Sequence, residues 1–125
     1  MKTIKYLFLF LFLFCSPVIR AQFPNPNLDS LFSIWNDPTT HDTSRLKAIQ
    51  IIAFEGYRTS KPDSSFYYAQ LQYDLAKEIG SKEQMANALI TQGFSFYIRN
   101  DFEMARDYYR NSLAIYEEIT DQVAS

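Results

Sequence analysis

Apolar residues recur at helical spacing along most of the chain. Between residues 42 and 58 they include Leu46, Ile49 and Ile52, and such intervals of three and four residues place side chains on one helix face. A second pattern opens near Pro62 and stops at Gly80, since proline suits a first helical turn and glycine a helix end. Two further helices are predicted within residues 81–121, joined by a tight corner at residues 99–101. The chain is therefore predicted to be all-α.

Local signals mark where two of these helices begin. Ser81 is followed three residues later by Gln84, which is typical of a capping box in which the two side chains bond to each other's backbone N–H groups. Asp101 and Glu103 fall in a first helical turn, where negative charge complements the helix dipole. We expect helices to begin at both places.

Residues 22–41 are predicted to form a linker that contains one short helix. The prolines within residues 22–27 bias the residues before them away from the helix. An apolar stripe at helical spacing follows, capped by Asn27 or Asp29. We expect Trp35 to dock over the open end of the first helical pair, and a partly ordered arm is the alternative. The stripe consists of Leu28, Leu31, Phe32 and Trp35.

The four long helices form two pairs that repeat along the chain. Adding forty to a residue number in the first pair gives a residue of similar kind in the second, small for small and apolar for apolar. Such a period indicates repeated structural units. The first copy is the less regular one, because Ala69 stands where the second copy has Tyr109. The matched pairs include Ile49 with Leu89, Ala53 with Gly93, Tyr57 with Tyr97, Ser65 with Ala105, and Leu75 with Ile115.

The second copy carries a position-specific pattern. Counting Ala86 as position 1, small residues stand at positions 8, 20 and 27 and bulky ones at 4, 11 and 24. This resembles a tetratricopeptide repeat (TPR), in which the small residues stand where two helices cross closely. The segment Ala105–Asp121 also resembles the A-x-x-Y-Y-x-x-S-L-x-I-x-E-x-x-G-D pattern of TPR proteins with an extended unit. The six positions are Leu89, Gly93, Phe96, Ala105, Tyr109 and Ser112.

The resemblance implies a TPR-like right-handed α-solenoid of antiparallel helix pairs. Residues 42–80 are then a degenerate TPR unit 1, and residues 81–120 are TPR unit 2. Residues 121–125 coincide with the start of a further unit, so we expect the chain to be a fragment of a longer protein. A solenoid buries each unit against its neighbours, and the apolar last helix has no successor in this sequence. The alternative is a short protein that covers this helix by self-association.

Residues 1–21 have the three parts of a secretory signal peptide. A positive head is followed by an apolar run at residues 6–14 and by a small residue, Ala21, before a polar one. We expect cleavage after Ala21 and export, either to the periplasm of a Gram-negative bacterium or as a secreted protein. A lipid anchor on Cys15 is the alternative, which Phe14 disfavours because a small residue is typical there.

Removal of the leader leaves little chemistry that is typical of an enzyme. The remaining nine basic and fourteen acidic residues give a net charge of −5, and no basic face is left to neutralise a phosphate backbone. No cysteine remains, so packing alone must hold an exported fold together. His41 is the only histidine and lies in a polar loop, and Glu117 and Glu118 are typical of a solvated face. We predict no catalytic site, no cofactor, no metal and no nucleic-acid partner.

The TPR resemblance also implies a concave groove, lined by the first helix of each unit. Aromatic residues there would anchor an extended peptide or a partner helix. The alternative, packing against the neighbouring unit, is as strong for Phe54 and Phe94, whereas Tyr57, Tyr97 and Lys47 are expected to be exposed. The carboxylate clamp of some TPR proteins is not matched. The candidate groove residues are Lys47, Gln50, Phe54, Tyr57, Asn87, Ile90, Phe94 and Tyr97.

A signal peptide followed directly by extended TPR units resembles the N-terminal part of bacterial envelope signalling proteins. In those, a periplasmic TPR array precedes a membrane helix and a cytoplasmic histidine kinase, cyclase or helix-turn-helix domain. The hypothesis is therefore an exported, non-catalytic protein–protein interaction or sensory module, with a protein or peptide in its groove. The alternatives are a complete small secreted scaffold that self-associates through its last helix, and the binding domain of a longer exported enzyme.

Overall fold

The computed structural model describes residues 26–124, and this part of the chain is all-helical, which confirms the predicted class. The predicted signal peptide lies outside the described residues, as does the start of the linker. Within residues 26–124, no helix combines the length and the apolar character that a membrane crossing requires. The elements are α2 (Leu28–Asn36), α3 (Asp42–Ile51), the π-helical segment η1 (Ile52–Gly56), α4 (Pro62–Ile79), α5 (Lys82–Ile98) and α6 (Phe102–Ala124).

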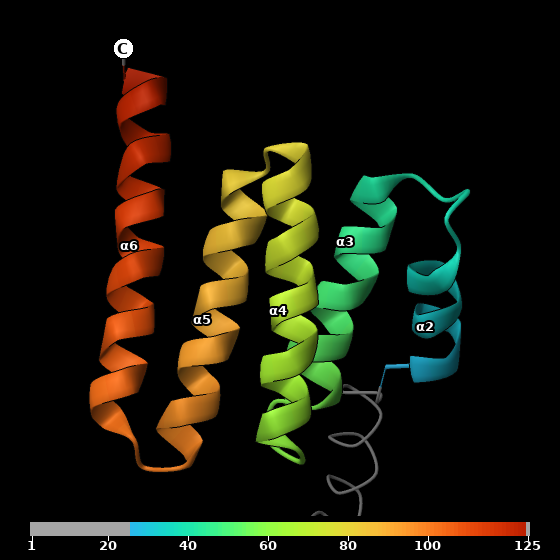
Figure 1. The fold of residues 1–125 in the computed structure, drawn as a ribbon, viewed down its shortest axis with the longest axis horizontal. Coiled ribbons are helices and arrows are strands. Elements are labelled where there is room, and N and C mark those ends of the chain that lie inside the picture. The colour runs from blue at the N-terminus through green and yellow to red at the C-terminus, as the bar shows by residue number, and fades with distance from the viewer. Residues whose placement is uncertain (1–25, 125) are drawn as a thin grey trace, which may run out of the picture.

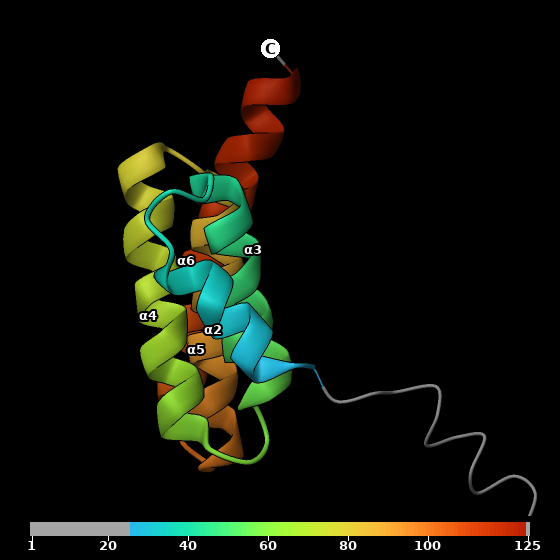
Figure 2. The ribbon, with the colours of Figure 1, turned by 90° about the vertical axis from the view of Figure 1, so that its right-hand side faces the viewer.

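Helices α3 to α6 lie side by side in chain order, and each runs antiparallel to the one before it (Figure 1). The most extensive contacts join α5 to α6 and α4 to α5. α2 packs at the other end of the row, beside α3, and the last turns of α6 extend past the other helices (Figure 2). The buried side chains therefore lie between successive helices.

Helix starts recur with the offset seen in the sequence. α3 and α5 begin forty residues apart, and so do α4 and α6. Gly80 ends α4 with a left-handed φ of 78°, and Asn100 has a φ of 63° in the corner before α6. The Asp101 carboxylate accepts a hydrogen bond from the Met104 N–H at 3.3 Å, which satisfies one of the free donors of the first turn of α6. Local chemistry thus marks the end of α4 and the start of α6.

The first helix of the first pair is not α-helical to residue 58 as predicted. It changes to a π-helix at Ile52 and ends at Gly56. A Cβ atom at Gly56 would lie 2.8 Å from the Leu28 side chain of α2, so glycine lets α2 approach closely here. A π-helix bonds each residue to the fifth one along, so side chains beyond it no longer follow the α-helical period.

α6 also differs from the prediction at its end. A new unit was expected to begin at Asp121, but α6 continues without a break through that residue to Ala124. At the equivalent boundary of the first copy, Gly80 adopts the left-handed conformation that ends α4. Thr120 stands forty residues further on, and a β-branched residue resists that conformation. The helix therefore has no local stop signal at this point.

The predicted capping box at Ser81 is wrong in its bonding, although α5 does begin there. Ser81 makes no side-chain capping bond. The Gln84 side chain instead donates to Gln50 Oε1 at 3.2 Å and accepts from Gln72 Nε2 at 2.9 Å. This chain of amides links α3, α4 and α5, so a contact between distant residues replaces the local one.

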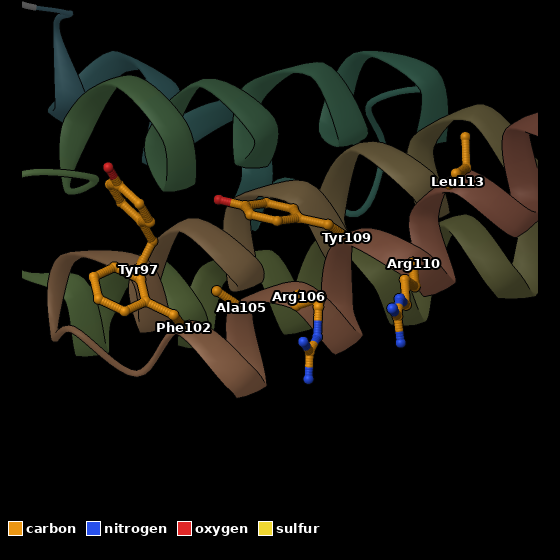
Figure 3. A pocket seen from close by; sticks show the side chains of 7 residues that line it. All are labelled: Tyr97, Phe102, Ala105, Arg106, Tyr109, Arg110 and Leu113. Carbon is orange, nitrogen blue, oxygen red and sulfur yellow. The ribbon is translucent and has the colours of Figure 1, made fainter.

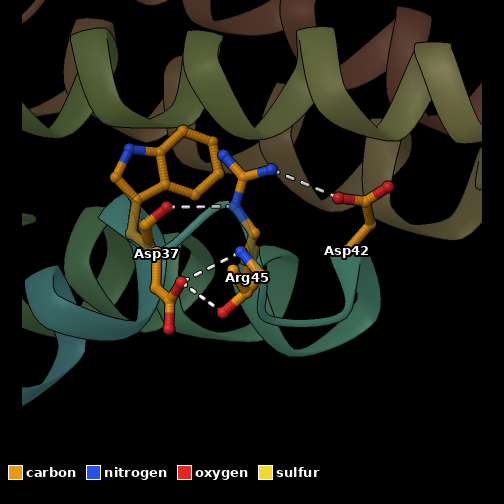
Figure 4. Close-up of polar contacts among 5 residues, drawn as sticks. Asp37, Asp42 and Arg45 are labelled. Atoms are coloured by element: carbon orange, nitrogen blue, oxygen red, sulfur yellow. Dashed lines mark hydrogen bonds and ion pairs between the residues drawn. The ribbon is translucent and has the colours of Figure 1, made fainter.

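α2 is a docked helix. Asn27 caps it by accepting from the Ser30 N–H at 3.1 Å. Trp35 packs against a buried cluster. The other residues of the predicted apolar stripe, Leu28, Leu31 and Phe32, pack against the same cluster. The Arg45 guanidinium lies 4.9 Å from the centre of the Trp35 ring and donates to the Trp35 carbonyl at 3.0 Å (Figure 4). The cluster consists of Leu46, Ile49, Ile52, Leu75 and Ala76.

The loop between α2 and α3 is held by Asp37. Its carboxylate accepts from the Thr39 hydroxyl at 2.7 Å and from the Thr39 N–H at 2.9 Å, and these bonds lower the pKa of Asp37. A lowered pKa means that the stabilisation is present above the ordinary carboxyl pKa and is lost as the pH falls through the lowered value. Because Asp37 is fully exposed, the effect on stability is small.

Small residues mark the close approach of α5 and α6. Gly93 is buried, and a Cβ atom there would lie 2.8 Å from Tyr109 Cε1 and 3.2 Å from Tyr108 Cβ. On the same interface the Ser112 hydroxyl donates to the Ala86 carbonyl at 2.9 Å. In the first pair, a serine at a different repeat position bonds across the helices: Ser65 donates to the Ala53 carbonyl at 2.7 Å. Small side chains therefore allow the helices of each pair to pack closely.

Candidate functional site

Three of the eight predicted groove residues lie together, joined by an arginine that the sequence analysis did not select. The guanidinium carbon of Arg58 lies 4.2 Å from the ring centre of Phe54 and 5.4 Å from that of Phe94. Phe94 stacks on Tyr97, with ring centres 5.9 Å apart, and Tyr97 meets the edge of Phe102 at 5.4 Å. We call these five residues the aromatic–arginine strip.

Arg58 has no ion-pair or hydrogen-bond partner among residues 26–124. Arg58 is half-buried, and attraction to the two aromatic rings holds its guanidinium. Arginine carries several N–H donors in a fixed plane that matches a carboxylate. The strip can therefore bind an anionic group beside apolar contacts, without an ion pair having to break first.

Tyr57 is not part of the strip, and the expectation that it is exposed is wrong. It is half-buried, and its ring stacks on that of Tyr68 with the ring centres 5.4 Å apart. It also packs against the buried cluster that contacts Trp35. The reason is the π-helical segment directly before it, which rotates Tyr57 away from the α-helical period. Tyr97, forty residues later on the regular helix α5, is 51% exposed.

The polar candidates make contacts within the fold. Gln50 accepts from Gln84, as described above, and Asn87 Oδ1 accepts a hydrogen bond from the Tyr116 hydroxyl. Burial, with a smaller contribution from Glu83, raises the pKa of Tyr116. Both amides are thus engaged between helices, which lowers their availability to a ligand.

The two remaining candidates are both exposed. Lys47 lines a hollow of about 280 Å³ between α2 and α3, which shares no lining residue with the strip. Ile90 is exposed on α5, in the turn before Phe94. Of the eight candidates, the strip therefore links three, Phe54, Phe94 and Tyr97.

A second surface adjoins the strip on the outer face of the α5–α6 pair. It is a hollow of about 270 Å³ with a mainly apolar lining. Arg106 and Arg110 extend side by side from α6 at its edge, while Tyr97 and Tyr109 lie on the other side (Figure 3). Burial, and to a lesser extent Tyr97, raises the pKa of Tyr109. This α5–α6 groove is lined by Tyr97, Phe102, Ala105, Arg106, Tyr109, Arg110 and Leu113.

Sequence reasoning missed Arg58, Arg106 and Arg110. Each does carry a local signal, because residues four apart on a helix are neighbours. Arg58 follows Phe54 by four residues, and the other two arginines are four apart from each other. The signal is weak, since most charged residues on helices are simply solvated. Their neighbours from other helices are what distinguish them.

No metal site is formed within the described part of the chain, where no three His, Cys, Asp or Glu side chains converge. Comparison with protein-family models, with curated proteins and with solved structures finds no match to the chain in any of the three. The arrangement of side chains must therefore carry any functional proposal.

Proposed function

We propose that this protein is a TPR-like, right-handed α-solenoid that acts as a non-catalytic protein–protein interaction module. Two features support the solenoid: helix starts recur every forty residues, and small residues separate the helices of each pair. Each unit of a solenoid packs only against its neighbours and leaves an extended surface for partners. In this proposal the aromatic–arginine strip is part of that surface.

Arg58 is the observation that carries the binding proposal. Its guanidinium lies between Phe54 and Phe94, which come from the two different units. Aromatic residues and arginine are the side chains that most often dominate binding energy at interfaces. The ligand is then a peptide segment with a carboxylate for Arg58 and an apolar side chain for the adjacent rings of Phe94 and Tyr97.

Selection from a random-peptide phage library tests this proposal. We expect the selected peptides to contain an acidic residue next to an apolar one. Arg58→Gln should raise their Kd about tenfold, which corresponds to the loss of one charge-assisted contact. The Kd is measured by fluorescence anisotropy.

Arg99→Gln is the matched control. Arg99 also lies over an aromatic ring, Phe96, at 5.1 Å, but it is paired with Asp63 away from the strip. This variant should leave the Kd unchanged. A library that yields no binder, or binders weakened equally by both variants, contradicts the proposal.

The cellular setting is proposed from the leader and the TPR resemblance. We propose an exported protein, the N-terminal part of an envelope signal-transduction protein, whose output domain lies beyond residue 125. The coding sequence downstream should then encode further helical pairs and an apolar run of about 20 residues. Translation ending at residue 125 would favour the secreted scaffold, and a downstream catalytic domain would favour the exported enzyme.

A further inference from the structure

Three glutamine side chains from three helices form a chain of hydrogen bonds whose direction is set by one backbone group. Gln72 of α4 donates from Nε2 to the Gln84 carbonyl at 3.3 Å and to Gln84 Oε1 at 2.9 Å. Gln84 of α5 donates in turn from Nε2 to Gln50 Oε1 of α3 at 3.2 Å. A backbone carbonyl can only accept, so the nitrogen of Gln72 must face it. The orientations of the other two amides follow from that contact.

The buried end of this amide chain is unsatisfied. Gln72 is fully buried, and its Oε1 is the only buried side-chain nitrogen or oxygen without a hydrogen-bond partner among residues 26–124. Such atoms cost stability and are few in native proteins. Turning the Gln72 amide over brings no relief, because its oxygen would then face the Gln84 carbonyl. A role at the other end of the chain, at Gln50, would explain why this arrangement is kept.

The surface end of the amide chain is the NH2 group of Gln50. Gln50 is half-buried, and its oxygen is occupied by Gln84. Its nitrogen has no hydrogen-bond partner within residues 26–124, yet the only buried unsatisfied side-chain atom in that range is Gln72 Oε1. The Gln50 nitrogen is therefore open to solvent. A free glutamine can turn its amide over and offer a donor or an acceptor, whereas Gln50 is held as a donor.

This donor lies in line with the aromatic–arginine strip. Phe54 follows Gln50 by four residues, which makes the two side chains neighbours on the helix. The Arg58 guanidinium lies over the Phe54 ring at 4.2 Å. Gln50 and Arg58 also both reach α5, through Gln84 and Phe94 respectively. The eight residues between them span about 12 Å along a helix, so one ligand can contact both.

Unpaired positive charge accompanies both contacts. Lys47 is exposed and precedes Gln50 by three residues, which again makes them neighbours. Neither Lys47 nor Arg58 forms an ion pair within the part of the chain that the structure describes. A hydrogen bond to a charged acceptor is stronger than one to a neutral acceptor, and a nearby ammonium favours the charged one further. The group that suits Gln50 is therefore a carboxylate.

We propose that Gln50 determines the specificity of the peptide site at the strip, by binding a second carboxylate of the same peptide. This inference rests on the proposed function. An extended peptide advances about 3.3 Å per residue, and its side chains alternate between two faces. Acidic residues four apart therefore point the same way and match the separation of Gln50 from Arg58. Gln84 and Gln72 are positioning residues that hold the Gln50 NH2 group outward.

Gln50→Glu tests the role of the donor. One carboxylate oxygen of the new side chain can still accept from Gln84, while the other places negative charge where the peptide carboxylate binds. We expect the Kd of the peptides selected from the phage library to rise at least about tenfold, measured by fluorescence anisotropy. Asn111→Asp is the matched control, because it makes the same change at an exposed amide of α6. It should leave the Kd unchanged.

A change in the peptide provides the second arm. Lysine in place of the second acidic residue should weaken binding to the unaltered protein and strengthen binding to the Gln50→Glu variant. A purely structural role of Gln50 would not produce this exchange of preference. Selected peptides without a second acidic residue, or the same preference for both proteins, overturn the inference.

The direction of the amide chain can be measured without any ligand. In NMR spectra of the free protein, the side-chain NH2 protons of Gln72 and Gln84 should exchange slowly with solvent and those of Gln50 quickly. Slow exchange at Gln50 would mean that the chain runs in the opposite direction, which overturns the inference.

Failure of this inference is distinguishable from failure of the proposed function. Peptides that are weakened by Arg58→Gln but not by Gln50→Glu would leave the site at the strip in place and remove only the second carboxylate contact. A library that yields no binder would remove both.

Discussion

Tyr57→Ala lowers the free energy of unfolding by about 2 kcal/mol, whereas Tyr97→Ala lowers it by less than about 1 kcal/mol. The two residues are equivalent in the forty-residue repeat, but only Tyr57 stacks on Tyr68 and packs against a buried cluster. Truncating a fully buried aromatic residue costs about 3–5 kcal/mol, and half-burial reduces that loss. Tyr97 is 51% exposed and loses mainly its contacts with Phe94 and Phe102.

Urea denaturation followed by circular dichroism at 222 nm, a standard helix signal, measures both values. The midpoint of thermal unfolding should fall by roughly 8–16 °C for Tyr57→Ala. Tyr57→Phe is the matched control, since it keeps the ring and should retain most of the stability. Equal losses for Tyr57→Ala and Tyr97→Ala would mean that the π-helical segment does not redirect Tyr57.

Gly93→Ala destabilises the protein, and a second substitution relieves the effect. The added methyl group would meet Tyr109 at 2.8 Å and Tyr108 Cβ at 3.2 Å. Overpacking of this kind costs about 1–3 kcal/mol, and the better helix propensity of alanine returns up to about 1 kcal/mol. A net loss of about 1–2 kcal/mol is expected.

The first pair of helices shows how the clash is avoided elsewhere in the chain. Ala53 and Ala69 stand at the places of Gly93 and Tyr109, and both are fully buried. In the first pair of helices, alanine in place of Gly93 is therefore accompanied by alanine in place of Tyr109. In a Tyr109→Ala background, Gly93→Ala should cost close to nothing, which gives a coupling of about 1–2 kcal/mol in a double-mutant cycle. Additive effects of the two substitutions would show that Tyr109 is not the obstacle.

The strip and the α5–α6 groove form a continuous surface, because Tyr97 and Phe102 belong to both. Three arginines without carboxylate partners among residues 26–124 lie along it. Acidic residues outnumber basic ones in the same part of the chain. This surface differs from that overall balance, because it carries unpaired positive charge beside apolar rings. The ligand proposed for Arg58 accordingly carries a carboxylate next to an apolar group.

The sequence by itself determined the helices and most of their boundaries. Pro62, Gly80 and Asp101 act within a few residues of themselves, through a fixed backbone angle, a permitted left-handed conformation and a side-chain cap. Such effects are local, so they can be predicted without knowing the rest of the fold. The buried position of Gly93 follows from the same periodicity, because a helix face repeats regularly along the sequence.

Only the tertiary structure decided the π-helical segment, the burial of Tyr57 and the surroundings of Arg58. Each depends on a contact between residues far apart in the chain: Gly56 meets Leu28, Tyr57 meets Tyr68, and Arg58 meets Phe94. A repeat in the sequence predicts equivalent environments, but one π-helical turn shifts the phase of every side chain that follows it. Helix periodicity alone cannot show which residues of different helices meet. The candidate site therefore depends on the packing between helices.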